Sequence, residues 1–301
     1  MTEIITADPS AVTPTGQLTL PAPAKLNLFL HITGRRPDGY HLLQTLFQIL
    51  DYGDELHFTA NHSGQISLSC NDPQLVGPDN LIYRAAMALK PLAGADAGVS
   101  IVLDKKIPMG GGLGGGSSDA ATTLLALNKL WRLQLSVSEL AAIGLKLGAD
   151  VPLFVEGYSA FAQGVGEQLQ AIELPEKVYL VVTPACHVST VEVFTHPDLI
   201  RDSAVISADD VLNSEHIRKW RNDCQPLVER LYPDVAITLQ WLVEYAPSRM
   251  TGTGASVFAE FPDEPSARRA LANLPANFRG FVARGVNRSP VLTALEHAVD
   301  T

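Results

Sequence analysis

Six glycines stand within seven consecutive positions near the middle of this 301-residue chain, and this run restricts the fold more than any other segment. They occupy residues 110–116, with only Leu113 between them. Glycine at this density loses much conformational entropy on folding, so a close backbone approach has to require it. Because backbone amides and helix N-termini bind phosphate, the run predicts a phosphate-binding loop. The alternative is a flexible hinge or linker, which the apolar, structured flanks disfavour.

The residues after the run predict the helix that such a loop needs. Positions 120–130 are strongly helical in composition, and Ser117, Ser118 and Asp119 are candidate N-caps. The hydroxyl of Ser117 or Ser118 would also suit a Mg²⁺ ion on bound phosphates. No Lys follows the glycines, as a P-loop requires, and the HRD and DFG motifs of protein kinases are missing. A dinucleotide fingerprint matches formally, but the acidic residue expected about twenty positions later is absent.

Charge, cysteines and length restrict the class of protein. The formal net charge of −10 disfavours non-specific binding to nucleic acid or an anionic membrane, since both need a basic surface. The three cysteines are widely spaced and make no metal-ligand pattern, so we expect reduced thiols in a cytoplasmic protein. Residues 1–17 lack the features of a signal peptide and predict a flexible tail, and no apolar run is long enough to span a membrane. A change in composition near residue 173 predicts two domains, at 18–173 and 174–301.

Two polar pairs near the N-terminus are candidates for ligand binding. Residues 18–33 predict a strand whose alternation puts Lys25 and Asn27 on one face, among small neighbours that leave room for a ligand. A surface lysine on an edge strand is the alternative. A Pro-Asp-Gly turn at 37–39 then presents Tyr40 and His41, which can stack on a flat ring and hydrogen-bond to it. Two ordinary loop side chains are the alternative there.

The remaining segments predict an α+β fold. Asp150 lies before Pro152 with no evident structural duty, although a cap or turn aspartate is the alternative. Ser136 and Glu139 predict a capping box at the start of a helix. Residues 42–50 are ambiguous between helix and strand. We expect strands at 54–59 and 65–70 (as a hairpin), 99–103, 153–161, 178–183, 257–261 and 280–286, and helices at 81–92, 208–230 (over most of its length), 235–245 and 264–274.

Five segments, in this order along the chain, resemble the motifs of the GHMP kinases, the family named for galactokinase, homoserine kinase, mevalonate kinase and phosphomevalonate kinase. They are residues 23–28, 38–41, 108–118, 147–152 and 251–254. The resemblance implies a two-domain α+β fold, with an N-terminal domain like ribosomal protein S5 domain 2, a C-terminal ferredoxin-like α/β sandwich and the active site in the cleft between them. The flanking residues are most similar to members that use ATP and Mg²⁺ to phosphorylate the 2-hydroxyl of a cytidine diphosphate-linked methylerythritol, in isoprenoid precursor biosynthesis by the non-mevalonate pathway. A monomer or weak homodimer is expected.

The resemblance also implies roles for individual residues. Asp150 would be the catalytic base and Lys25 its charged partner, which is sensible because an ammonium keeps the carboxylate ionised. The cytidine end of the substrate would be held by Asn27, Tyr40, His41, Thr190 and Phe194, with the Tyr and Phe rings on the two faces of the base and the His at its edge. ATP would contact Asn80 and Lys105 near the adenine, and Pro108, Gly110, Gly111, Gly112, Leu113, Gly114, Gly115, Gly116, Ser117 and Ser118 around the phosphates. The loop Thr251, Gly252, Thr253 and Gly254 would close the site.

Two residues depart from the pattern of these members. Val191 stands where they carry Pro, and Asp119 stands where some carry Asn. We expect Asp119 to cap the helix after the glycine run rather than to bind Mg²⁺. The open alternatives are another GHMP kinase, a nucleotide-binding sensor without catalysis, and a dinucleotide oxidoreductase. Tyr40, His41 and Phe194 argue against a homoserine or mevalonate kinase, because those substrates have no base to stack.

Overall fold

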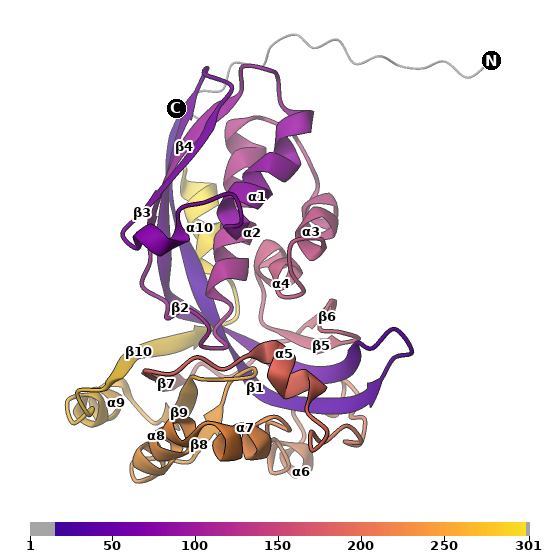
Figure 1. Cartoon of the computed structure of the whole chain (residues 1–301), viewed down its shortest axis with the longest axis vertical. Helices are drawn as coiled ribbons and strands as arrows, with labels where there is room; N and C mark the ends of the chain where they lie inside the picture. Colours follow the sequence, from indigo (N-terminus) through magenta and orange to yellow (C-terminus); the bar gives the residue numbers. More distant parts are fainter. Residues whose placement is uncertain (1–15, 299–301) are drawn as a thin grey trace.

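Two long antiparallel strands run through both halves of the molecule. The computed structural model describes residues 16–298, and β1 (Gln17–Arg35) pairs with β2 (His41–Asn61) over most of their length. Figure 1 shows this pair passing from the helical upper half into the lower half. The strand expected at 18–33 is confirmed, and the ambiguous segment 42–50 is part of β2. Bulges interrupt the register on both sides of the Lys25–Asn27 segment, and bulges are a common means of redirecting side chains at sites.

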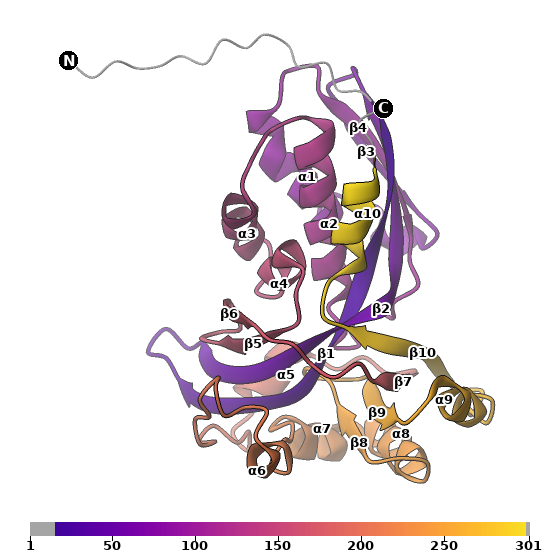
Figure 2. The same cartoon turned by 180° about the vertical axis from the view of Figure 1, so that it is seen from behind.

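One face of the sheet in the upper half is covered by helices (Figures 1 and 2). The long β1–β2 pair is joined there by β4 (Gly98–Asp104) and β3 (Ile66–Cys70). The helices are α1 (Leu81–Leu89), α2 (Gly115–Leu130), α3 (Val137–Leu145), α4 (Val151–Glu156) and α10 (Pro290–His297). Their apolar side chains and those of the sheet form one buried core, including Phe58, Leu124 and Phe154. The last helix, α10, belongs to this core although it lies at the end of the chain.

The lower half is a smaller antiparallel sheet with helices packed on it. Its strands are β7 (Val178–Pro184), β8 (Ser248–Met250), β9 (Val257–Phe261) and β10 (Phe278–Val286), and it carries α8 (Pro233–Val243) and α9 (Glu264–Leu271). β10 also pairs briefly with β2, which joins the two halves in the order β3-β4-β2-β10-β7-β9-β8. The expected α+β class and antiparallel C-terminal sandwich are confirmed. The division at residue 173 stays a prediction.

Several local expectations are wrong. Segments 54–59 and 65–70 form no hairpin, because β4 lies between β2 and β3 and pairs with both. The strand expected at 153–161 is α4 followed by β5 (Ala160–Gln163), since Pro152 falls in the first helical turn, where its missing N–H leaves no bond unmade. Residues 208–230 are not mostly helical, because they hold only the short α6 (Ser214–Ile217) and all but the last residue of α7 (Gln225–Leu231).

Other local expectations are confirmed. The capping box of Ser136 and Glu139 is present at the start of α3. All three cysteines are free. Within residues 16–298 no helix is long and apolar enough to cross a membrane. The tail predicted at 1–17 lies outside the described residues up to position 15.

Candidate active site

The helix after the glycine run begins inside the run itself. α2 starts at Gly115, and Gly114 takes the N-cap position with a left-handed backbone (φ 73°) and no side-chain cap. The expectation that Asp119 caps this helix is therefore wrong, and Ser117 and Ser118 are not its caps either, because all three lie within its first turns. The N–H groups of a first helical turn have no partners within the helix, so they remain available for an anion.

A cavity of about 380 Å³ opens at this helix start and is lined by residues 108–117 together with Leu75, Asn80, Leu81, Lys105 and Asp119. The structure thus places the glycine run, Asn80 and Lys105 around one hollow. Asn80 is also the N-cap of α1, and its side chain bonds Ile82 N and Leu75 O at 2.8 and 2.7 Å. Among the two candidate serines, Ser117 lines the cavity, whereas Ser118 is fully buried and its Oγ has no hydrogen-bond partner among the described residues.

The loop at 251–256 is bound directly to the glycine run. The N–H groups of Ala255 and Ser256 donate to the carbonyls of Gly110 and Gly111 at 3.3 and 3.2 Å. The hydroxyl of Thr251 donates to the Gly112 carbonyl at 3.3 Å. These bonds hold a segment of the lower half against the glycine run of the upper half. The hinge or linker interpretation of the glycine run is therefore wrong.

Lys25 and Asp150 meet although 125 positions separate them in the sequence. The Lys25 Nζ lies 3.4 Å from Asp150 Oδ2 and donates to Asn27 Oδ1 at 2.6 Å and to the Gly112 carbonyl at 2.9 Å. Lys25 is only 3% exposed, so it is not a surface lysine. Asp150 stands in a turn at the N-cap position of α4, as the alternative interpretation had it, but its side chain makes no capping bond. Its carboxylate is 31% exposed and accessible to a substrate.

Asn27 connects this pair to the second loop. Its backbone N–H donates to Thr251 Oγ1 at 2.9 Å, and its side-chain amide donates to Thr45 Oγ1 at 2.9 Å. The amide oxygen and one amide hydrogen of this side chain are therefore bound within the protein. Asn27 holds Lys25 in place, while contact with a cytidine stays a prediction. Thr45 is a positioning residue that sequence reasoning missed, because a threonine inside an apolar strand gives no signal.

A second cavity, of about 350 Å³, adjoins the first and contains the Lys25–Asp150 pair. Gly112, Gly114 and Ser117 line both cavities. A phosphate held at the start of α2 would therefore border the space beside Lys25 and Asp150. The remaining lining comes from Asn27, Thr45, Phe47, Ala149, Thr190, Phe194, Gly252, Thr253 and their neighbours.

A third, largely apolar hollow of about 520 Å³ continues from the second and contains the aromatic residues. Tyr40 is 64% exposed, His41 is buried, and the Phe194 ring lies 5.2 Å from the His41 ring between centroids. Phe194 comes from α5 (Thr190–Thr195), whose first residue bonds Thr253 through their hydroxyls at 3.0 Å. Val191, on the same helix, is 72% exposed at the rim.

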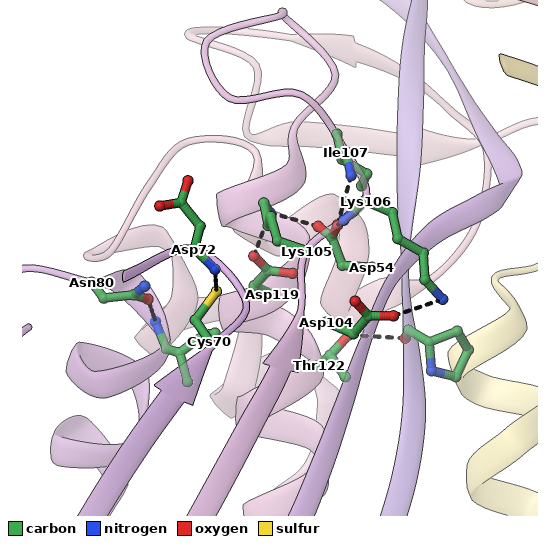
Figure 3. A network of polar contacts seen from close by, with 12 residues as sticks. Asp54, Cys70, Asp72, Asn80, Asp104, Lys105, Lys106, Ile107, Asp119 and Thr122 are labelled. Carbon is green, nitrogen blue, oxygen red and sulfur yellow. Dashed lines mark hydrogen bonds and ion pairs between the residues drawn. The ribbon is translucent and has the colours of Figure 1, made fainter. Parts of the chain in front are cut away.

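A buried ionic cluster supports the wall of the first cavity (Figure 3). Lys105 Nζ lies 2.5 Å from Asp54 Oδ2 and 2.6 Å from Asp119 Oδ2. The other oxygen of Asp54 accepts the backbone N–H groups of Lys106 and Ile107, at 2.6 and 2.7 Å, just before the glycine run. Sequence reasoning missed Asp54, because its partners lie about fifty positions away. The cluster fixes the chain entering the loop and leaves Lys105 bound on two sides.

Two carboxylates, of Asp54 and Asp119, share the Lys105 ammonium, and this arrangement shifts the pKa values of Asp119 and Lys105. Burial, together with the charge of Asp54, raises the pKa of Asp119 to about 8 against the attraction of Lys105. Burial lowers the pKa of Lys105, but the two carboxylates outweigh it and raise that pKa overall. The folded protein therefore binds a proton at Asp119 that the unfolded chain, with an ordinary carboxyl, has released.

We expect Asp119→Asn to change how stability depends on pH. Since the pKa of Asp119 is raised on folding, this residue makes the protein less stable as pH rises from about 4 to about 8. The amide cannot ionise, so the variant should gain about 4 kcal/mol relative to wild type between pH 5 and pH 8.5, at about 1.4 kcal/mol for each pH unit below the raised pKa. Urea unfolding at several pH values measures this. Asp104→Asn, which replaces an exposed carboxylate on β4, is the control and should show no such gain. If the stability of Asp119→Asn and that of wild type changed with pH in parallel, the raised pKa of Asp119 would be contradicted.

The described residues contain no group of three or more His, Cys, Asp or Glu that could hold a metal ion by themselves. Ser117, which lines both cavities, offers a hydroxyl, and Asp150, which lines the second, offers a carboxylate. Hydroxyl and carboxylate oxygens suit Mg²⁺, which usually keeps several waters and takes further ligands from substrate phosphates. The donor set therefore fits a magnesium ion that arrives with a phosphate ligand.

Comparison with known proteins agrees with this geometry. The family model for the N-terminal domain of GHMP kinases matches residues 80–158, and the model for their C-terminal domain matches residues 204–280. The 4-diphosphocytidyl-2-C-methyl-D-erythritol kinase of Shewanella loihica is 57% identical over 91% of this chain and 96% of its own length. That of Tolumonas auensis is 56% identical over 92% and 95%.

Solved structures show the same relationship. A crystal structure of 4-(cytidine 5'-diphospho)-2C-methyl-D-erythritol kinase superposes with a TM-score of 0.76 at 34% identity, covering 89% of this chain and all of that one. The mevalonate kinase of Methanococcus jannaschii shares the fold at a TM-score of 0.66 and 17% identity, over 91% and 99% of the two chains. By its domains, its fold and its relatives, the chain belongs to the GHMP kinase family.

Proposed function

We propose that this protein is an ATP-dependent kinase that phosphorylates the 2-hydroxyl of 4-diphosphocytidyl-2-C-methyl-D-erythritol, in isoprenoid precursor biosynthesis by the non-mevalonate pathway. The observation that carries the proposal is the row of three adjoining cavities, with Lys25 and Asp150 in the middle one. A phosphate loop lies on one side of this pair and an aromatic hollow on the other. The names of relatives at 57% identity support the same substrate. The expectations of a cytoplasmic enzyme and of a monomer or weak homodimer stay predictions.

The phosphate donor would lie in the first cavity. The amides of the glycine run and the start of α2 would hold its phosphates, and Ser117 would offer a hydroxyl to the accompanying Mg²⁺. Bound in this way, the metal supplies positive charge that offsets the charge of the transferring phosphoryl group. Lys105 would border the nucleotide while remaining bound to its two carboxylates.

The acceptor hydroxyl would lie in the second cavity beside Asp150. Its carboxylate would take the hydroxyl proton, and Lys25 would keep that carboxylate ionised and attract the developing alkoxide. Lys25 is held for this task by Asn27 and by the Gly112 carbonyl. In phosphoryl transfer, positioning and charge stabilisation usually contribute more than the base, and the loop bound at Thr251 supplies much of that positioning.

The cytidine end would occupy the third hollow. The exposed ring of Tyr40 would cover one face of the base and Phe194 the other, with His41 at the edge. Thr190 would stay bound to Thr253 on the closing loop. A nucleotide-binding sensor would need no buried Lys25 beside Asp150, and an oxidoreductase would need no separate aromatic hollow.

The test is an ADP-release assay on the purified protein with ATP and four acceptors. We expect turnover with 4-diphosphocytidyl-2-C-methyl-D-erythritol and none with mevalonate, homoserine or galactose at equal concentration. Turnover with one of the other three alone would overturn the substrate assignment. NADH binding without any ADP release would favour the oxidoreductase instead.

Tyr40→Ala is expected to weaken binding of the cytidine substrate. Stacking of a base on an aromatic side chain contributes about 1–3 kcal/mol, so KM for that substrate should rise by roughly five- to a hundredfold. KM for ATP should not change, because Tyr40 lines only the third hollow. Steady-state kinetics with each substrate varied in turn measures both. Tyr40→Phe keeps the ring and should behave like wild type, and a rise confined to KM for ATP would contradict the stacking role.

A further inference from the structure

Arg201 connects two of the three aromatic residues of the third hollow, His41 and Phe194. Its Nε donates to Nε2 of His41 at 2.9 Å. One guanidinium nitrogen donates to the carbonyls of Phe194 and His196 at 3.0 and 2.8 Å, and the other to that of Leu199 at 2.9 Å. The side chain thereby joins the start of β2 to the end of α5. The sequence motifs predict no role for Arg201.

The contact determines where the His41 proton resides. A guanidinium has donors only and stays charged, so Nε2 of His41 has to be an acceptor. A neutral imidazole that accepts at one nitrogen carries its hydrogen on the other, here Nδ1. Within residues 16–298 nothing hydrogen-bonds to that Nδ1. The His41 side chain lines the third hollow, so its Nδ1–H is free to bind a ligand there.

The surroundings of His41 also favour the neutral form of its imidazole ring. Burial lowers the pKa of His41, and the charges of Arg201 and Arg35 lower it further. These are the charged groups that face the ring from the α5 side and from β1. Protonation would also place a cation against Arg201 and abolish the bond at Nε2. Burial and both arginine charges therefore favour the neutral form of His41.

We propose that Arg201 is a positioning residue for base recognition, which fixes His41 as the neutral tautomer whose Nδ1–H donates to an acceptor atom of the cytosine ring. This inference rests on the proposed function, because it deepens the cytidine site. Without Arg201, neutral His41 can take either tautomer, and Nδ1 becomes an acceptor in part of the molecules. Protonation at low pH would give Nδ1 its hydrogen back.

The first readout needs no activity. Long-range ¹H–¹⁵N NMR of the full-length protein, with His41 assigned from the spectrum of His41→Gln, reports the tautomer of each imidazole. Wild type should show neutral His41 as the Nδ1–H form. Arg201→Met, which has similar length but no donor or charge, should show mixed tautomers and a higher pKa of His41, because one of the charges that lower this pKa is gone. An Nε2–H tautomer in wild type, or a His41 pKa that is no higher in Arg201→Met, would overturn the proposal.

The second readout distinguishes a role of Arg201 in fixing the His41 tautomer from a role in stabilising α5 alone. The Kd for CDP is measured by calorimetry for wild type and Arg201→Met, and the ratio of the two cancels the titration of the phosphate itself. At pH 8 we expect the Kd of Arg201→Met for CDP to be about tenfold that of wild type. This ratio should fall towards pH 5.5, because protonation of His41 in the variant restores the hydrogen on Nδ1. A ratio constant over pH, with unchanged tautomers, would mean that Arg201 only supports the helix and would overturn the proposal.

Two further variants complete the design. Arg201→Lys keeps a charged donor and should recover part of the affinity at pH 8. Arg230→Met removes an exposed arginine that pairs with Asp198 in the same segment, and it should match wild type at every pH. A wild-type protein that fails to bind CDP but shows the Nδ1–H tautomer would overturn the cytidine role and the proposed function together. An Nε2–H tautomer with normal CDP binding would overturn the Arg201 proposal alone.

Discussion

Asp150→Asn is expected to lower kcat by about a thousandfold and to leave the affinities for ATP and CDP within about twofold of wild type. The amide has the shape of the carboxylate but cannot take the proton of an alcohol. Lys25 should keep its place, because Asn27 and the Gly112 carbonyl still accept from it at 2.6 and 2.9 Å. ADP release measures kcat, and calorimetry with each ligand measures binding.

A matched control separates this effect from general damage to α4. Glu156 lies at the other end of the same short helix and is exposed, so Glu156→Gln makes the same chemical change away from the cavities. It should retain wild-type kcat. If Asp150→Asn kept more than a tenth of wild-type kcat, Asp150 would act by positioning or charge alone. If it lost CDP affinity together with kcat, the substrate rather than the proton would be its main partner.

The sequence was most informative where chemistry and local geometry coincide. The glycine run is recognisable because only a special backbone explains its density, and the helix that follows begins within it. The β1 strand and the capping box of α3 follow from short-range pattern. Fold class and some of the residues lining the three cavities could likewise be named in advance, through ordered motifs shared with the GHMP kinases, whereas Thr45 and Phe47 of the second cavity could not.

Contacts between distant segments could not be predicted in the same way. Asp119 follows a loop and has the composition of a cap, but Gly114 in a left-handed conformation starts the helix earlier and turns Asp119 towards Lys105. Asp54 and Arg201 hold functional segments through partners 51 and 160 positions away. No local pattern encodes such distances, because they depend on how β2 is placed in the sheet. Local propensity also failed at Pro152, where packing selected a short helix.

Gly112→Ala is expected to separate the two loops of the active site. The backbone of Gly112 has a φ of +72°, and an added Cβ would lie 2.3 Å from the Thr251 carbonyl oxygen. The left-handed backbone costs a residue with a Cβ about 1–2 kcal/mol, and overpacking against backbone costs about 1–3 kcal/mol more. The free energy of unfolding should therefore fall by about 3 kcal/mol or more. Because the Gly112 carbonyl also accepts from Lys25, kcat should fall by at least about tenfold.

Gly116→Ala is the informative comparison, since it adds the same methyl group four residues later. A Cβ there would meet only Leu81 Cδ1, at 3.6 Å, and the residue lies in the first turn of α2, where alanine is favoured over glycine by about 0.5–1 kcal/mol. Its unfolding free energy should be unchanged or slightly higher. Urea unfolding and ADP release on both variants test this contrast. If Gly112→Ala and Gly116→Ala had equal stability and equal turnover, the close approach of the loop at 251–256 would not explain the glycine at position 112. Phosphate contact would then remain as the reason for the glycines of the run.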